Sequence, residues 1–218
     1  MRTISALTCA AASLFLGIQQ AKAASASICD SITGNLVTNC GFETNDFTGW
    51  SLSGNDVPAE LNNLYGVEGQ DPLDLISPHS GNDQAYIADF VSNATTLSQT
   101  LTTVPGGEYT VSLYLAQDTA PDSGGPGFSN EFDATFDGIT VDDLTDVPEE
   151  GYTEYTDTFD VTDSSSVLDI TLGNDLGEFL LDDVSVVATP EPSAWKLTFG
   201  GVLLMGFAFR RKLVKKEH

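Results

Sequence analysis

The chain has 218 residues and a formal net charge of −24 at pH 7, from 32 acidic side chains and eight lysines and arginines. The eight basic side chains all lie near the ends, at Arg2, Lys22 and within 196–216, so residues 24–189 hold 30 acids and no lysine or arginine. This surface of one sign excludes nucleic acid and anionic lipid as partners, although a solvated acidic coat explains the same charge without a dedicated function.

Residues 1–23 have the layout of a secretory signal peptide. The charged Arg2 precedes an apolar segment from Ile4 to Ile18 and a small-residue end, Ala21-Lys22-Ala23. This order predicts export and cleavage before residue 24, so the segment is excluded from the fold. The following residues, 24–188, have the length of one domain with a hydrophobic core.

The exported region contains two cysteines, Cys29 and Cys40. In an oxidising compartment we expect them to form a disulfide, which would stabilise the fold by about 3 kcal/mol. Two free buried thiols are the alternative. A metal pair lacks partners, because His79 is the single histidine of the domain.

Three sequence patterns of the domain each resemble a pattern found in one known fold. They are Asn35–Glu43 followed by Phe47–Trp50, then His79–Ala85, and finally Phe179–Val186. Together they resemble the galactose-binding-like β-sandwiches, which include several carbohydrate-binding modules. The resemblance implies that 35–43 forms the opening strand, that Phe42 and Trp50 are buried, and that Glu43 is a structural calcium ligand. Cys40-Gly41 departs from the family pattern.

Alternation of apolar and polar residues predicts the remaining strands. Residues 55–80 are expected to be a loop and 85–90 a strand. Residues 96–101 and 109–115 are expected to pair as an antiparallel hairpin through Pro105-Gly106-Gly107. In the strand at 109–115 we expect Val111, Leu113 and Leu115 to face the core. Thr110, Ser112 and Tyr114 should lie on the opposite face.

Further strands are predicted in the second half of the domain, after a loop at 118–129. Asp137-Gly138 should turn the chain between strands at 131–136 and 139–141. The others are expected at 152–161, 167–172 and 178–187, and Tyr155, Phe159 and Val161 should point inward. The predicted fold class is therefore all-β, an antiparallel β-sandwich of jelly-roll type.

Two adjacent acids, Asp182 and Asp183, lie in the middle of the apolar last strand. Acids there are costly to bury unless they are hydrogen-bonded or bind a cation. We expect a structural Ca²⁺ shared by Glu43, by Asp182 or Asp183, and by a loop carbonyl near Ser80, since Ca²⁺ takes six to eight oxygen ligands. The alternative is that both acids lie at the rim and contact only water.

A carbohydrate ligand would require exposed aromatic rings. Trp50 is the one tryptophan of the domain, and the other candidates are Tyr65, Tyr86, Tyr114 and Phe128. We select Tyr65 and Phe128 as ligand-binding residues because both are predicted in loops. A single histidine and the lack of basic residues remove most catalytic schemes, so we expect no enzyme; a glycoside hydrolase using a carboxylate pair is a remote alternative.

The C-terminal segment, residues 189–218, combines three features. Pro190, Glu191 and Pro192 precede an apolar run at 194–209, and a basic tail at 210–218 begins with Arg210 and Arg211. The run predicts a transmembrane helix of about 24 Å, short for a permanent span, and the basic tail predicts a cytoplasmic end.

This order resembles the PEP-CTERM sorting domain, which implies cleavage by an exosortase-type membrane protease after a transient stay in the inner membrane. An uncut single-span anchor is the alternative. We expect an exported, non-catalytic protein of the cell surface or extracellular matrix, such as a biofilm matrix, associated with extracellular polysaccharide. A lectin-like carbohydrate-binding module is the alternative function.

Overall fold

The structure is a computed structural model that describes residues 26–54, 64–69, 76–119, 124 and 126–189. The expected signal peptide lies outside these residues, and so does the expected sorting signal apart from Thr189. Within the described segments, no helix has the length and apolar character needed to cross a membrane.

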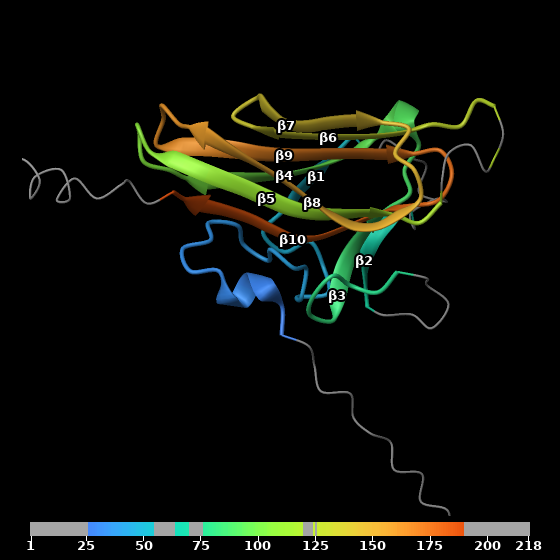
Figure 1. Ribbon diagram of the computed structural model, residues 1–218, viewed down its shortest axis with the longest axis horizontal. Coiled ribbons are helices and arrows are strands. Elements are labelled where there is room, and N and C mark those ends of the chain that lie inside the picture. Colours follow the sequence, from blue (N-terminus) through green and yellow to red (C-terminus); the bar gives the residue numbers. More distant parts are fainter. Residues whose placement is uncertain (1–25, 55–63, 70–75, 120–123, 125, 190–218) are drawn as a thin grey trace, which may run out of the picture.

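Two antiparallel sheets pack face to face (Figure 1), which confirms the all-β sandwich. The first sheet has the order β1 (Ser51–Ser53), β4 (Thr95–Thr102), β9 (Ser165–Asn174), β6 (Asn130–Phe136) and β7 (Ile139–Thr145). The second has the order β2 (Tyr65–Gly69), β3 (Asp83–Ile87), β10 (Phe179–Ala188), β5 (Glu108–Gln117) and β8 (Glu150–Asp160). Two short 3₁₀ helices, η1 (Ile28–Ser31) and η3 (Val91–Asn93), lie in the connections.

The core fills the space between the two sheets. Alternate residues of each strand point into it, as the side-chain period of two requires. Val111, Leu113 and Leu115 of β5 are buried as predicted. Phe159 and Val161 are also buried, and Tyr155 is partly buried against the core. Phe42 and Trp50 also belong to the core. Full burial of an apolar side chain of this size contributes about 1.5–3 kcal/mol.

The predicted hairpin between 96–101 and 109–115 is wrong in its pairing, although both segments are strands. β4 pairs with β1 and β9 in one sheet, whereas β5 pairs with β10 and β8 in the other. The connection crosses between the sheets and bonds to the loop after β8, where Gly106 N–H donates to the Val161 carbonyl. Alternation identifies the buried face of a strand but not its partner.

Two further predictions are corrected. The segment 35–43 is not a strand: it makes one isolated bridge, Asn35 to Val187, and then turns, with Asn39 and Phe42 at positive φ. The expected loop at 55–80 contains edge strand β2, whose two glycines weaken the strand signal in the sequence. The hairpin of β6 and β7 through Asp137-Gly138 is confirmed, with both turn residues at positive φ.

A β-bulge in β10 shapes the region where the N-terminal segment meets the second sheet. Pairing with β5 shifts by one residue between Asp182 and Ser185, and Asp183 has a φ of 49°. The Val184 N–H then donates to the Cys40 carbonyl (2.8 Å) instead of to β5. Cys40 is joined to Cys29 by the predicted disulfide, with Cα atoms 6.0 Å apart. The bulge thereby binds the N-terminal segment to the strand.

Candidate functional site

The outer face of the second sheet carries a group of aromatic rings. In the strand register Asp182 of β10 lies opposite Tyr114 of β5, which lies opposite Glu154 of β8. Leu180, two residues before Asp182, lies opposite Tyr86 of β3. Residues directly opposite each other share a face, and the alternate residues of these strands form the core. Tyr86 and Tyr114 therefore point outward, and so does Tyr152, which lies two residues before Glu154 on β8.

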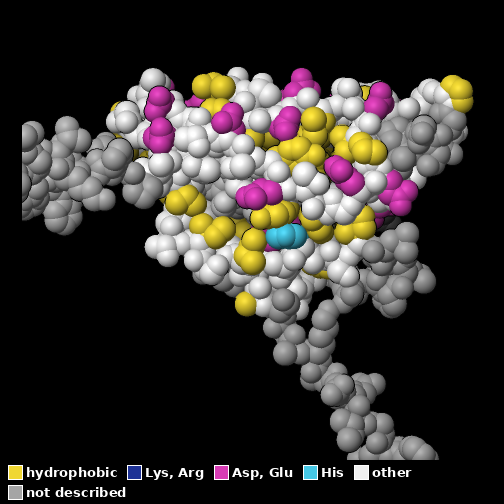
Figure 2. Space-filling model, viewed as in Figure 1, with side chains coloured by type: hydrophobic (Ala, Val, Ile, Leu, Met, Phe, Trp, Pro, Cys, Tyr) yellow, Lys and Arg dark blue, Asp and Glu magenta, His cyan; other side chains and the backbone are white. Residues whose placement is uncertain are grey.

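His79 adds a fourth ring from the loop before β3. Its ring stacks on Tyr114 with centroids 3.7 Å apart, and it meets Tyr152 edge-on at 5.3 Å. Figure 2 shows the histidine ring open to solvent among hydrophobic and acidic side chains; 27% of the side chain is exposed. We call the surface formed by His79, Tyr86, Tyr114 and Tyr152 the aromatic face.

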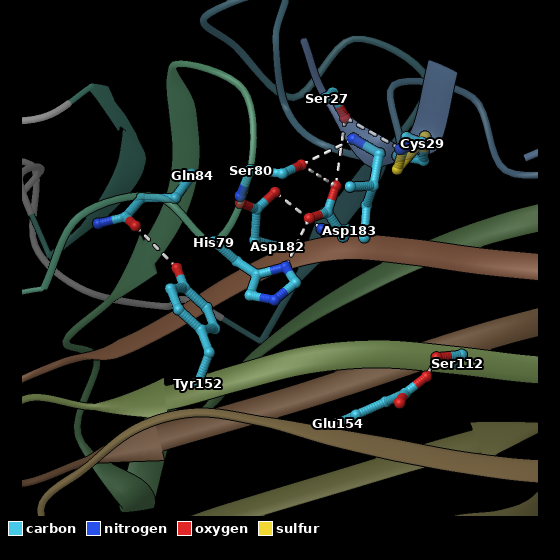
Figure 3. Close-up of polar contacts among 12 residues, drawn as sticks. Ser27, Cys29, His79, Ser80, Gln84, Ser112, Tyr152, Glu154, Asp182 and Asp183 are labelled. Carbon is cyan, nitrogen blue, oxygen red and sulfur yellow. Dashed lines mark hydrogen bonds and ion pairs between the residues drawn. A yellow bond between two sulfur atoms is a disulfide. The ribbon is translucent and has the colours of Figure 1, made fainter. Parts of the chain in front are cut away.

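A chain of hydrogen bonds spans this face from β8 to β2, and Figure 3 shows its first bond, between Tyr152 and Gln84. The Tyr152 hydroxyl of β8 donates to Gln84 Oε1 of β3 (2.7 Å), and Gln84 Nε2 donates to Glu68 Oε1 of β2 (3.2 Å). The bond from Tyr152 to Gln84 therefore passes over β10 and β5, which lie between β8 and β3 in the sheet. Burial, and then the charges of Asp182, Asp183 and Glu68, raise the pKa of Tyr152.

Tyr86 lies against the backbone of the edge strand. It is directly opposite Gly66, and a side chain at that position would collide with the tyrosine ring. The glycine thus provides the space in which the ring rests. Opposite strand residues of this kind often combine a glycine with an aromatic ring.

Asp183 connects the aromatic face to the N-terminal segment (Figure 3). Its Oδ1 accepts hydrogen bonds from the hydroxyls of Ser27 (3.2 Å) and Ser80 (2.8 Å), and its Oδ2 lies 2.8 Å from His79 Nδ1. The carboxylate itself is buried. The Asp183 carboxylate therefore holds the histidine ring in its stacked position on Tyr114.

Asp182 is also buried, and its hydrogen bonds are to backbone groups. Oδ2 accepts from the Ser80 N–H (3.1 Å) and Oδ1 from the Asp183 N–H (2.7 Å). These bonds favour the ionised form, but burial and then the charge of Asp183 outweigh them and raise the pKa of Asp182 to about 8.

Glu43 approaches the same loop from the other side. Its Oε1 accepts hydrogen bonds from the N–H groups of Asn82 (2.7 Å) and Asp83 (3.1 Å), and Oε2 accepts one from the Asn82 amide (3.2 Å). Gly81, at a φ of 67°, passes so close that any side chain there would run into the Glu43 carboxylate. The glutamate thus caps the turn that leads into β3.

Of the four residues predicted to bind calcium, Glu43, Asp182 and Asp183 all contact the segment 79–83, which contains the fourth, Ser80. Their oxygens suit Ca²⁺ chemically. The Glu43 oxygens, however, face the amides of 82–83, while both aspartates face Ser80 and its neighbours, so an ion shared by all four would replace several of these hydrogen bonds. Over the described part of the chain, no group of three or more His, Cys, Asp or Glu side chains is arranged as a metal site.

The two predicted ligand-binding aromatics lie elsewhere. Tyr65 is the first residue of β2, not a loop residue; it is half-buried against the core, with its ring 6.2 Å from that of Phe47. Phe128 is 43% exposed just before β6. Neither is part of the aromatic face.

The aromatic face includes residues that the sequence analysis did not select. Tyr114 was a candidate, and its outward direction followed from the alternation in β5. His79 was noted as the single histidine of the domain, but nothing in the sequence placed its ring on Tyr114. Gln84 and Tyr152 are joined across three strand pairings, which no local pattern predicts.

Comparison with known proteins gives distant structural likenesses. The sequence matches no protein-family model and no curated protein sequence. Among solved structures it is similar to the enzymatically active domain of bacteriophage CBA120 tailspike protein 4, with 16% identity and a TM-score of 0.46 over 71% of this chain, and it spans only 21% of that one.

Two smaller solved structures are covered almost completely. One is TmCBM61, solved in complex with β-1,4-galactotriose, with 18% identity, a TM-score of 0.49, and coverage of 71% of this chain and 99% of that one. The other is the CBM22-1 xylan-binding domain of Paenibacillus barcinonensis Xyn10C, with 14% identity, a TM-score of 0.46, and coverage of 68% and 90%. Likenesses at this level carry no conclusion about a ligand.

The raised pKa of Asp182 predicts a specific pH dependence of stability. Because the folded protein holds this proton more tightly than the unfolded chain, the contribution is fully present below about pH 4 and is lost as the pH rises through about 8. In Asp182→Asn, with EDTA present, this decline should be reduced by up to about 5 kcal/mol. Urea unfolding at a series of pH values measures it.

The exposed Asp163 provides the matched control, since Asp163→Asn removes the same charge far from any burial and should keep the wild-type pH profile. A decline in Asp182→Asn as steep as that of the wild type would show that Asp182 does not carry the effect.

Proposed function

We propose that the domain is a non-catalytic carbohydrate-binding module and that the aromatic face is its binding surface. The observation that carries this proposal is the gathering of four rings, from β3, β5, β8 and the loop before β3, on one face of a sheet. A sugar ring presents C–H groups that pack on an aromatic ring, and hydroxyls that need hydrogen-bond partners.

Polar groups lie between and beside the rings. Gln84 and Glu68 are joined at one side of the face, and Ser112 donates to Glu154 Oε1 (2.7 Å) at the other. Gln84 is buried and its amide is bonded within the protein, so the groups that can bond to sugar hydroxyls are the Ser112 hydroxyl and the carboxylates of Glu68 and Glu154. The rings are held by strands and by the Asp183 carboxylate, so little conformational entropy is lost when a ligand binds.

The wider setting of this function rests on the sequence. Residues 1–23 and 189–218 support an exported protein whose C-terminal segment is a PEP-CTERM signal, cut by an exosortase-type protease. The module would then act at the cell surface or in the extracellular matrix, bound to polysaccharide. A glycoside hydrolase remains the remote alternative.

Sugar binding should depend on the aromatic face. Tyr114→Leu keeps the apolar bulk of the side chain but removes the ring that stacks on His79, and we expect it to weaken binding by about tenfold, in line with about 1.4 kcal/mol for one aromatic contact. Glycan-array screening of the wild type identifies the sugar, and calorimetry with that sugar measures the loss.

Phe128→Leu is the matched control, because Phe128 is exposed outside the aromatic face. Equal loss in both variants would extend the surface to Phe128, the residue that the sequence favoured. Loss in Phe128→Leu alone would move the binding surface away from the aromatic face, and absence of any bound sugar would refute the proposal.

We also propose that Ca²⁺ stabilises the junction of β10 and the segment 79–83. The domain has no lysine or arginine to neutralise Asp182 and Asp183, and the surrounding donors are oxygens that suit this ion. Added Ca²⁺ should raise the melting midpoint and EDTA should lower it, whereas Glu43→Gln should reduce the difference. An unchanged midpoint in Ca²⁺ and in EDTA would exclude a structural ion.

The processing proposal has its own measurement. Mass spectrometry of the protein isolated from its native cells should give an N-terminus at Ala24 and a C-terminus near Pro190, because both terminal segments are expected to be removed. A mature protein that retains residues 194–209 would contradict exosortase processing and would support the uncut anchor instead.

A further inference from the structure

Each phenol ring of the aromatic face has carboxylates beside it. Glu154 lies opposite Tyr114 in the register, and Glu68 is joined through Gln84 to Tyr152. Burial, and then the charge of Glu154, raise the pKa of Tyr114; burial, and then Glu68 and Glu178, raise that of Tyr86. The phenol oxygens therefore all lie in negative potential.

No positive side chain balances this potential. Residues 24–189 contain no lysine or arginine, and Figure 2 shows acidic side chains and the ring of His79, but no lysine or arginine, on the described part of this face. A ligand with carboxylates or sulfates of its own would be repelled. A ligand with positive groups would be attracted both by the carboxylates and by the electron-rich faces of the tyrosine rings.

The protein's own His79 shows the geometry of such a contact, because it places a ring nitrogen between an aromatic ring and a carboxylate. Its ring lies on the face of Tyr114 with Nδ1 2.8 Å from the Asp183 carboxylate. An aromatic face on one side and a carboxylate on the other form the environment in which an ammonium group is held.

We propose that the ligand of the aromatic face carries ammonium groups, and that a polysaccharide of amino sugars with free amines is the class that fits. This inference rests on the proposed carbohydrate binding and adds the charge of the sugar. The rings receive the C–H faces of the sugar, while Glu154 and Glu68 lie within the same face to pair with its amines. The same chemistry disfavours uronic-acid polymers.

The experiment compares a β-1,4-linked glucosamine hexamer with its fully N-acetylated form by calorimetry at low and at high ionic strength. The two probes differ only in the acetyl groups that remove the charge. We expect the free-amine hexamer to bind about tenfold more tightly at low ionic strength, and the difference to shrink when salt screens the carboxylates.

Two charge-matched variants locate the effect. Glu154→Gln should reduce the advantage of the free-amine hexamer by about three- to fivefold. Asp157 is exposed on the same strand, and because side chains alternate along a strand it lies on the opposite face from Glu154. Asp157→Asn removes the same charge and should leave the advantage of the free-amine hexamer unchanged. Equal losses in the two variants would show attraction to the acidic surface as a whole, and would overturn the site.

The other outcomes separate this inference from the function on which it rests. Equal or tighter binding of the N-acetylated hexamer overturns the ammonium inference but leaves carbohydrate binding intact. Failure of both hexamers and of every sugar on the array overturns the two together. A hexalysine peptide that binds as tightly as the free-amine hexamer overturns the choice of a sugar in favour of a basic peptide.

Discussion

The contacts of the Asp183 carboxylate at the bulge of β10 are the constraint on which the aromatic face depends. The bulge turns this residue out of the strand, and its two oxygens then hold Ser27, Ser80 and His79. A buried carboxylate requires such partners, because its transfer from water is costly. The N-terminal segment, the loop before β3 and the last strand are joined by this one group.

The absence of basic side chains explains why hydroxyls, amides and one imidazole take this role. In most domains a buried aspartate pairs with lysine or arginine, but residues 24–189 offer neither. Glu43 is likewise held by backbone N–H groups and an asparagine amide. Hydrogen bonds from neutral hydroxyls and amides stabilise a carboxylate without cancelling its charge, so the aromatic face stays negative. The electrostatic character of the candidate site thus follows from composition.

Local sequence patterns were sufficient to predict where most strands lie, but not which strands pair with one another. The alternation in 109–115 identified Val111, Leu113 and Leu115 as core residues, because the side-chain period of two is a property of any strand. The same pattern suggested a hairpin with 96–101, which the structure replaces with a crossing between sheets. The two glycines of β2 weaken its strand pattern in the sequence, and the strand forms by pairing with β3.

The sequence by itself determined the all-β class, the disulfide, the single sign of the surface, and the unusual acids Asp182 and Asp183 within an apolar strand. The tertiary structure alone decided that His79 stacks on Tyr114, that Tyr152 reaches Gln84, and that Tyr65 packs against the core. The physical reason is the order of strands. A residue's face is set by its immediate neighbours in the chain, whereas the ring beside it comes from a strand dozens of residues away.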